Sequence, residues 1–306
     1  MSDNRIYRTR SLGIPAAGLK DQYSDGTAAH LWELYIGDKS QRTAVYRKFI
    51  TDQLKARNCI TVLDVACGTG IDSVMLLEEG FRLTSVDLSD KMLKYALKTR
   101  WKRRKEPAFD AWEIEEANWM TLTEDIYGEE QFDAVICLGN SFAHLPNKEL
   151  DFANQRLALS NFCAMVKPGG VLLIDHKNYD DILERGTSPT HNIYYNGEHL
   201  ESIITSVVVT EGTPVLVTLD YVIKLDGDKD LRDDTDSERA KRGRLQKVTQ
   251  NKFRLSCFPH RLDSFTSLLK ETFGPEAQHS VYGDFQPLGH IPSPVFYIHL
   301  IEKPAR

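Results

Sequence analysis

Two glycines one residue apart follow a short apolar segment near residue 62. The segment 62–66 leads into Gly68 and Gly70, and the residues after them have helical spacing. Glycine lets the backbone approach a ligand closely, and the start of a helix supplies N–H donors to it. A tight turn without a ligand explains this spacing equally well when it is taken alone. The pattern predicts a nucleotide-like ligand only if a second signal agrees.

That second signal is Asp87, at the end of the next apolar segment, 81–86. A carboxylate at the end of the second strand of a parallel sheet can accept hydrogen bonds from both hydroxyls of a ribose. Because the carboxyl ends of neighbouring parallel strands meet at one edge, Asp87 and the glycine turn are expected to face the same ligand.

An acidic residue, Asp64, precedes the turn, and no third glycine opens the following helix. This departs from the dinucleotide fingerprint. A carboxylate there would repel a pyrophosphate but attract an ammonium group, which favours S-adenosylmethionine over a nicotinamide cofactor. The alternative for Asp64 is a structural role in capping the loop.

Further candidates follow the later strands. Asn118 and Trp119 could hydrogen-bond to an adenine and stack on it, although a half-buried tryptophan is an equal alternative. Gly139, Asn140 and His144 lie beyond the carboxyl end of the apolar run 132–138, where open α/β sheets bind ligands. A single histidine is more often structural.

Aromatic residues gather in two regions that could cover this site. An aromatic face or phenol oxygen stabilises a sulfonium cation without offering a competing nucleophile. Core packing is the more common role for any one of them. The candidates are Tyr23, Trp32 and Tyr35 near the N-terminus, and Tyr194, Tyr195 and Tyr221 further along.

The surrounding segments alternate between strand and helix patterns. From Ser40, a plausible N-cap, a helix should run to about residue 58. Strands are expected at 61–66, 81–86, 132–138 and 170–175, and helices at 72–79, from 89 or 90 to 104, and at 150–165. Largely apolar strands are typical of a parallel sheet buried on both faces.

The pattern changes after residue 177. The β-branched runs 203–210 and 215–225 predict antiparallel strands, and the segment 226–244 has few large apolar residues and is expected to be a solvated loop. A helix at 264–273 and strands at 279–285 and 295–302 then return to the first pattern. We therefore expect an N-terminal arm (1–39), a catalytic α/β domain (40–177 and 252–306) and an inserted substrate or lid subdomain (178–251).

The composition favours a small-molecule partner. The chain has 306 residues and a net charge of −6, without the basic balance typical of nucleic-acid binders. Its five cysteines are widely spaced and form no C-x-x-C pair, which argues against a disulfide framework or a zinc site and favours a reducing compartment. No leader or membrane segment is evident, so a cytoplasmic location is expected.

Long stretches of the chain resemble the glycine N-methyltransferase family. They include Tyr7-Arg-Thr-Arg-Ser-Leu-Gly, Asp21-Gln-Tyr, Leu34-Tyr-Ile-Gly-Asp, Leu63-Asp-Val-Ala-Cys-Gly-Thr-Gly, Asp90-Lys-Met-Leu-Lys-Tyr-Ala-Leu-Lys, Glu115-Glu-Ala-Asn-Trp-Met-Thr-Leu, Cys137-Leu-Gly-Asn-Ser-Phe-Ala-His-Leu-Pro and Thr218-Leu-Asp-Tyr. The resemblance runs along nearly the whole chain.

The resemblance implies a Rossmann-like class I methyltransferase fold, with a seven-stranded mostly parallel sheet and an antiparallel lid. It also implies a homotetramer whose N-terminal arms help close neighbouring sites, and inhibition by folate. The donor S-adenosylmethionine would contact Tyr23, Trp32, Tyr35, Arg42, Ala66, Asp87, Asn118, Trp119, Leu138 and His144. The amino acid would face Asn140, Tyr195 and Tyr221.

Three positions depart from the family pattern. Lys177 stands where well-studied animal members have an arginine that grips the substrate carboxylate, and lysine loses the two-pronged geometry. Cys257 replaces a tyrosine near the substrate. Ala17 replaces a glutamate of the N-terminal arm, so the arm is expected to close the site differently from that of other family members.

The resulting hypothesis is N-methylation of glycine, giving sarcosine and S-adenosylhomocysteine, by direct in-line transfer without a metal. Catalysis would consist mostly of positioning the two reactants. The free amine is the reactive form, so activity should rise into mildly alkaline conditions, and no side chain stands out as a general base.

Alternatives are the same fold acting on sarcosine, dimethylglycine or another small amine, and a donor- or folate-binding regulatory protein. A nicotinamide-dependent oxidoreductase is less favoured.

Overall fold

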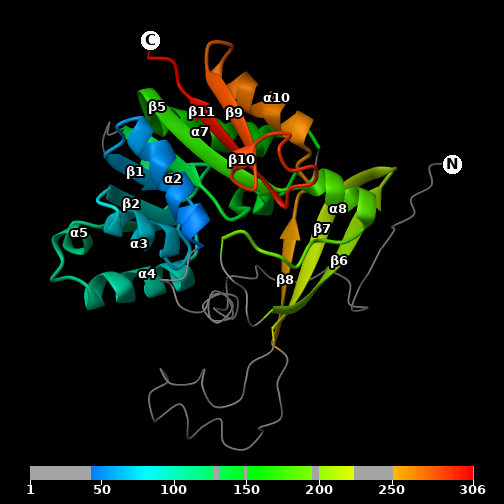
Figure 1. Cartoon of the computed structure of the whole chain (residues 1–306), viewed down its shortest axis with the longest axis horizontal. Helices are drawn as coiled ribbons and strands as arrows, with labels where there is room; N and C mark the ends of the chain where they lie inside the picture. The colour runs from blue at the N-terminus through cyan, green and yellow to red at the C-terminus, as the bar shows by residue number, and fades with distance from the viewer. Residues whose placement is uncertain (1–42, 127–130, 148–149, 195–199, 224–250, 306) are drawn as a thin grey trace, which may run out of the picture.

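The main element of the fold is a twisted, mixed sheet of eight strands. The computed structural model describes residues 43–126, 131–147, 150–194, 200–223 and 251–305 (Figure 1). The strand order is β10-β9-β11-β5-β4-β1-β2-β3, and the pairings among β1 to β5 are parallel. Their bounds are β1 Thr61–Asp64, β2 Arg82–Asp87, β3 Glu113–Glu116, β4 Phe132–Cys137, β5 Val166–Lys177, β9 Gln278–Gly283, β10 Gln286–Pro287 and β11 Phe296–Glu302.

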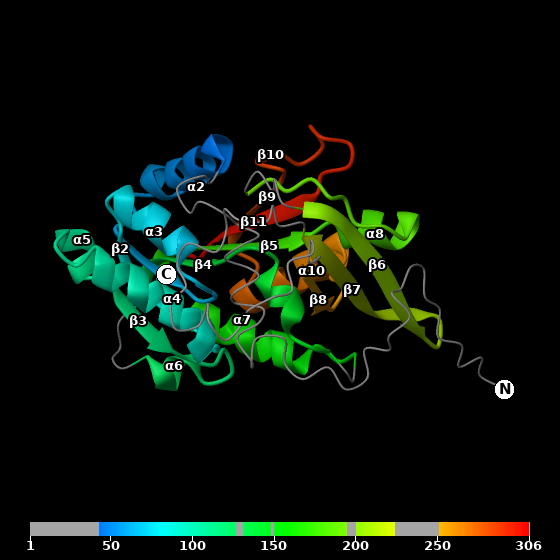
Figure 2. The same ribbon diagram turned by 90° about the horizontal axis from the view of Figure 1, so that it is seen from below.

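Helices cover both faces of this sheet. Figure 2 shows α2 and α3 on one side and α6 and α7 on the other. The bounds are α2 Ala44–Ala56, α3 Ile71–Glu78, α4 Asp90–Lys102, α5 Pro107–Asp110, α6 Leu122–Asp125, α7 Ala153–Met165, α8 Tyr179–Arg185 and α10 Leu262–Phe273, with a 3-10 turn η1 at Ser141–His144. Strand residues alternate between the two cores: Ile136 packs with α2 and α3, whereas Val135 and Cys137 pack with α7 and α10.

A second, antiparallel sheet lies beside the first (Figure 1). It contains β6 Leu200–Thr210, β7 Thr213–Ile223 and β8 Asn251–Cys257 in the order β6-β7-β8. Glu211 and Gly212, both with positive φ, join β6 to β7. A two-residue turn of this kind matches the twist of a hairpin. The predicted antiparallel strands after residue 177 are therefore confirmed.

The fold class is confirmed, and the differences from the expected elements are local. The main sheet has eight strands instead of seven because the two-residue β10 pairs with the edge strand β9. The helix expected to begin at residue 89 or 90 is α4, and Ser89 caps it by accepting a hydrogen bond from Met92 N. Thr43 caps α2, and Ser40 lies outside the described residues.

The boundary expected at residue 251 does not coincide with the edge of the second sheet. Strand β8 pairs with β7 from Asn251 to Cys257, so this sheet continues six residues further. Backbone hydrogen bonding to β7 decides the position, and the sequence around residue 251 carries no turn signal. The division into arm, catalytic domain and insertion otherwise stays a prediction. No helix in the described part of the chain is long and apolar enough to cross a membrane.

Candidate active site

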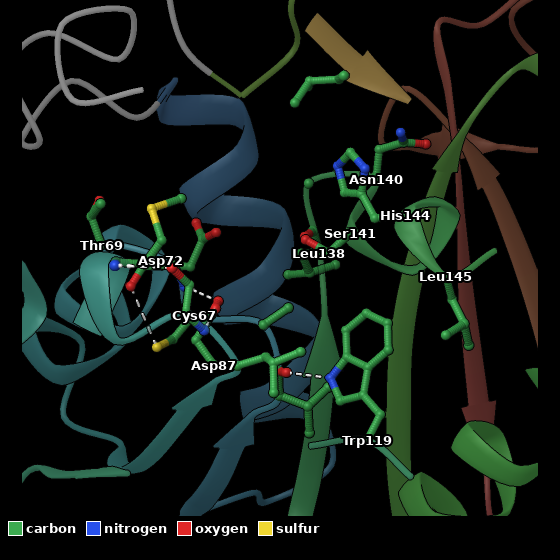
Figure 3. Close-up of a pocket in the computed structure, with 18 of the residues that line it drawn as sticks. Cys67, Thr69, Asp72, Asp87, Trp119, Leu138, Asn140, Ser141, His144 and Leu145 are labelled. Carbon is green, nitrogen blue, oxygen red and sulfur yellow. Dashed lines mark hydrogen bonds between the residues drawn. The ribbon is translucent and has the colours of Figure 1, made fainter. Parts of the chain in front are cut away.

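A cavity of about 390 Å³ opens at the carboxyl edge of the main sheet, and its size suits a small organic ligand. Figure 3 shows part of its lining, with Asp87 and Trp119 below and Asn140 and His144 on the far side from the glycine turn. The predicted site residues that line it are Ala66, Gly68, Asp87, Asn118, Trp119, Leu138, Asn140, His144, Lys177 and Tyr221. The fold therefore brings most of the candidates together.

Two backbone N–H groups hold the carboxylate of Asp87, the residue expected to bind a ribose. Gly68 adopts a φ of +54°, and its N–H donates to Asp87 Oδ2 at 2.9 Å. Ser89 N–H donates to Oδ1 at 2.9 Å. These bonds fix the carboxylate at the cavity wall, and a carboxylate has about four acceptor positions, so both oxygens can also accept from a ligand.

Gly70, expected near the cofactor, is not among the residues that line the cavity. Its φ is +84°, and a Cβ placed there would lie 2.7 Å from Trp112 Cη2 and 3.0 Å from Ala96 Cβ. Glycine is therefore required at this position by helix packing behind the turn. The G-x-G spacing could not show which of the two glycines faces the ligand.

Asp64 also lies behind the turn instead of facing the cavity. Its side chain is 3% exposed and accepts hydrogen bonds from Ser73 Oγ at 2.7 Å and Ala66 N at 3.3 Å. Burial, and then the negative charge of Asp72, raises the pKa of Asp64 to about 7. Asp64 is therefore not among the residues that line the cavity, and its contacts are those of the structural alternative, a residue that caps the loop.

Trp119 lines the cavity with its ring, but its polar atom is already paired. The indole N–H donates to Val65 O at 2.6 Å (Figure 3), and the ring stacks on Phe142 with centroids 5.7 Å apart. Asn118 Oδ1 accepts from Met120 N at 3.0 Å. Hydrogen bonding to an adenine is therefore expected from the Asn118 amide nitrogen, whereas Trp119 offers apolar surface.

Asn140 joins the loop after β4 to the end of β5. It has a φ of +65° and is 4% exposed. Its Oδ1 accepts from Lys177 N at 2.9 Å, and its Nδ2 donates to Tyr179 Oη at 2.9 Å and lies 3.6 Å from Cys257 Sγ. These bonds fix the Asn140 amide at the cavity wall, and its expected contact with the amine stays a prediction.

Lys177 supplies a buried cation at the same end of the cavity. The side chain is 4% exposed, and Nζ lies 4.7 Å from the centre of the Phe296 ring. Burial lowers the pKa of Lys177 to about 8, against the smaller opposing effect of Cys257 and Asp175. An anionic ligand group beside it would therefore stabilise the charged form of Lys177.

Cys257 and His144 lie next to this cation. His144 Nδ1 is 3.1 Å from Ser256 O and 4.0 Å from Cys257 Sγ. Burial would raise the pKa of the Cys257 thiol, but His144 and Lys177 outweigh it and lower the pKa. The cysteine is completely buried and is not among the lining residues, but its neighbours Asn140 and His144 are.

Several lining residues were missed by the sequence reasoning. Asp72, Met92, Asn192, Leu255 and Phe296 line the cavity, and so does Tyr194, which was considered only within an aromatic group. Asp72 had a usable signal, because it is the acidic residue in the first turn of the helix that follows the glycines. Asn192 had none, since it belongs to an irregular segment.

Other predicted residues lie outside the part of the chain that the structure describes. These are Tyr23, Trp32, Tyr35, Arg42 and Tyr195, together with Ala17 and the loop 226–244. Within the described residues, no cluster of three or more His, Cys, Asp or Glu side chains is arranged to hold a metal ion.

Comparisons with known proteins agree with this geometry. Residues 62–170 match a family described as a methyltransferase domain. The chain is 53% identical to glycine N-methyltransferase of Rattus norvegicus, over 97% of this chain and 98% of that protein. It is 35% identical to glycine/sarcosine/dimethylglycine N-methyltransferase of Actinopolyspora halophila, over 90% of this chain and 41% of that protein.

The fold is shared more widely than the sequence. The CcbJ methyltransferase from Streptomyces caelestis has a similar structure, with a TM-score of 0.65 at 13% identity, over 94% of this chain and 100% of that one. At this identity the likeness shows the fold alone. From the full-length similarity to the rat enzyme, the chain belongs to the glycine N-methyltransferase family of S-adenosylmethionine-dependent methyltransferases.

Proposed function

We propose that this protein methylates the amino nitrogen of glycine with S-adenosylmethionine, giving sarcosine and S-adenosylhomocysteine. One observation carries the proposal: a single cavity is lined at one part by Asp87 and Asn118, suited to an adenosine, and at another by the buried cation Lys177. The rat relative, named a glycine N-methyltransferase, supports the same reaction.

The residues fit the donor. Gly68 and Asp87 suit its ribose, and Asn118 and Trp119 suit its adenine. When bound, S-adenosylmethionine supplies a methyl group on a sulfonium that an amine can attack. Tyr23, Trp32, Tyr35 and Arg42 remain predicted donor contacts.

The acceptor end suits an amino acid. Lys177 would hold the carboxylate, which directs the amine towards the centre of the cavity. Tyr221, 4% exposed on β7, contributes an aromatic wall there. Tyr195 remains a predicted contact. Holding two reactants in line can lower a barrier by roughly 7–11 kcal/mol in the best cases, so in-line transfer needs little besides positioning.

A second candidate is the same reaction with sarcosine, dimethylglycine or another small amine as acceptor. Lys177 and Cys257 motivate it, because lysine binds a carboxylate with less directional constraint than arginine. The Actinopolyspora relative, whose name includes all three amines, supports it. A donor- or folate-binding regulatory protein is the candidate from another class, although no feature of the described cavity favours it over catalysis.

Further proposals rest on the family resemblance. They are a homotetramer, inhibition by folate, catalysis without a metal and a cytoplasmic location. The five cysteines, all free, fit the reducing compartment that the last proposal requires.

The test is to measure kcat/KM for glycine, sarcosine and dimethylglycine in parallel, with donor binding measured separately by calorimetry. Glycine as the preferred acceptor supports the proposal, whereas preference for another amine supports the second candidate function. Tight donor binding without transfer to any amine would instead favour the regulatory protein.

A further inference from the structure

Four histidines lie together on the face of the main sheet that α10 covers. His176 is on β5, His299 on β11 and His279 on β9, which are neighbouring strands (Figure 1), and His260 precedes α10. His176, His299 and His260 are buried, and His279 is half-buried. Burying a polar ring costs free energy unless it is hydrogen-bonded, so packing alone does not explain this choice of residues.

Three of these histidines form a continuous chain of hydrogen bonds. His279 Nε2 is 2.9 Å from His299 Nδ1, and His299 Nε2 is 3.1 Å from His176 Nε2. His176 Nδ1 is 2.8 Å from the carbonyl oxygen of Lys177. The chain therefore crosses three strands and ends on the backbone of the lysine that lines the cavity.

The carbonyl at the end of the chain decides which nitrogen carries each proton. A carbonyl oxygen only accepts, so His176 must be protonated on Nδ1, and the Nε2 of its neutral ring then accepts. His299 must therefore donate from Nε2 and accept at Nδ1, and His279 must donate from Nε2. The neutral rings thus have one consistent arrangement of protons, in which each hydrogen bond is donated in the direction of Lys177.

The surroundings keep these rings neutral near pH 7. Burial lowers the pKa of His176 and of His279 to about 4, and it also lowers the pKa of His299. Two charged side chains act on the ends of the chain. Lys270 of α10 lowers the pKa of His279 further, whereas Asp180 of α8 has a smaller, opposite effect on His176.

The backbone of Lys177 is held on both sides. Its N–H donates to Asn140 Oδ1 at 2.9 Å, and its carbonyl accepts from His176. Successive side chains of a strand point to opposite faces, so His176 faces α10 while the Lys177 side chain faces the cavity. The Phe265 ring of α10 packs edge-on against His176 and His299, with centroids 4.8 Å and 5.1 Å away. This packing fixes the planes of the two imidazoles.

We propose that His176, His299 and His279 are positioning residues, which fix the carbonyl of Lys177 so that its ammonium meets the carboxylate of the acceptor. The inference rests on the proposed function, because that function requires Lys177 to bind the acceptor. It adds residues on the far side of β5 to those that set the affinity for the amino acid. Asp87, at the donor end, is held by other contacts, so donor binding should not depend on the chain.

The kinetic test replaces the middle histidine in the full-length protein. His299→Phe keeps an aromatic ring but removes both hydrogen bonds, whereas His299→Gln can still donate to His176 and accept from His279. His299→Phe should raise KM for glycine roughly 3- to 10-fold, as expected when about one hydrogen bond's net contribution is lost from acceptor binding, and kcat should change less than KM. His299→Gln should raise KM less than about 3-fold.

Two measurements on the same variants separate positioning from a general loss of structure. The affinity for S-adenosylhomocysteine, measured by calorimetry, should change less than about 2-fold in either variant, because the donor end is distant from the chain. Far-ultraviolet circular dichroism would check each variant's fold. If His299→Phe does not fold, His279→Phe removes only the outer donor and should still raise KM for glycine about 2- to 3-fold.

The proton positions provide a test that does not depend on catalysis. Solid-state NMR of the full-length protein with 15N-labelled histidine distinguishes a proton on Nδ1 from one on Nε2, and single His→Gln variants assign the signals. Near neutral pH, His176 should carry its proton on Nδ1, and His299 and His279 should carry theirs on Nε2.

An unchanged KM in His299→Phe, or an equal rise in His299→Gln, would overturn the inference. An equal loss of affinity for S-adenosylhomocysteine would also overturn it, and so would a proton on His176 Nε2. If the unchanged protein transfers methyl groups to no amine, the proposed function fails and this inference fails with it. Normal transfer to glycine, with a KM that does not respond to His299, would overturn the inference alone.

Discussion

Asn140 Oδ1 accepts the backbone N–H of Lys177 at 2.9 Å, which ties the left-handed turn after β4 to the last residue of β5. Both residues are buried, and the same amide donates to Tyr179 Oη. The position of the only lysine that lines the described cavity therefore depends on a side chain from the turn after the neighbouring strand.

Removing this amide should destabilise the fold. Asn140→Ala leaves the Lys177 N–H and the Tyr179 hydroxyl buried without this partner, and it places alanine at a φ of +65°. We expect a loss of about 2–4 kcal/mol in the free energy of unfolding, measured by urea denaturation.

Asn140→Gly is the matched control, because glycine tolerates this φ. It should be roughly 1 kcal/mol more stable than Asn140→Ala. Equal stability of the two variants would show that backbone strain contributes nothing at this position.

The charge of Lys177 should set the upper pH limit for binding of the acceptor. Its pKa of about 8 lies below the usual value, so the ligand-free protein loses this charge as pH rises through about 8. The KM for glycine, expressed per free amine, should therefore rise several-fold between pH 7.5 and 9.5 in the unchanged protein.

Lys177→Arg provides the comparison, since arginine stays charged over this range. Its KM, expressed in the same way, should be nearly constant with pH. A rise of the same size in both proteins would mean that another group titrates.

Gly70 should matter for stability and not for a direct donor contact. Gly70→Ala adds a Cβ 2.7 Å from Trp112 Cη2, in addition to an unfavourable positive φ. We expect a loss of roughly 3 kcal/mol or more in the free energy of unfolding. Gly80→Ala is the control, because Gly80 has a φ of +93° and nothing lies within 4 Å of an added Cβ; its loss should be only about 1–2 kcal/mol. Similar losses in both would argue against the clash.

Asp64 should make the folded protein less stable as pH rises. Its pKa in the folded state, about 7, is above the usual value, so between about pH 4 and 7 the folded state binds a proton that the unfolded state has released. The free energy of unfolding should therefore fall over this interval.

Asp64→Asn removes this contribution. The difference in unfolding free energy between the two proteins, measured in urea at pH 5 and pH 8, should shift by up to about 3 kcal/mol in favour of the variant at pH 8. Asp175, whose pKa is raised to about 6 by burial, is present in both proteins and cancels. If the difference in unfolding free energy between the two proteins does not change with pH, the raised pKa of Asp64 is contradicted.

The parallel sheet and its helices could be predicted because their sequences carry independent signals. Apolar strands such as β4 and β5 are buried on both faces, and Ser89 is a clear helix cap. The end of the second sheet could not be predicted, since β8 is defined by its pairing with β7 across a long separation in sequence.

The sequence predicts which edge of the sheet holds the site, but it does not predict which single side chains face the cavity. Strand order brings Gly68, Asp87 and Asn140 to one sheet edge, as the topology requires. Which carboxylate faces the cavity depends on the backbone conformation of the turn after β1. Asp64 accepts a hydrogen bond from Ser73 behind this turn, whereas Asp72 lines the cavity. The spacing of residues in the sequence does not reveal this backbone conformation.

Methyl transfer from labelled S-adenosylmethionine to glycine, sarcosine and dimethylglycine, with the unchanged protein and Lys177→Arg in parallel, tests the central claim most directly. The account predicts labelled sarcosine as the main product, formed in equal amount with S-adenosylhomocysteine. Absence of label in sarcosine, in a protein that binds the donor, would contradict it.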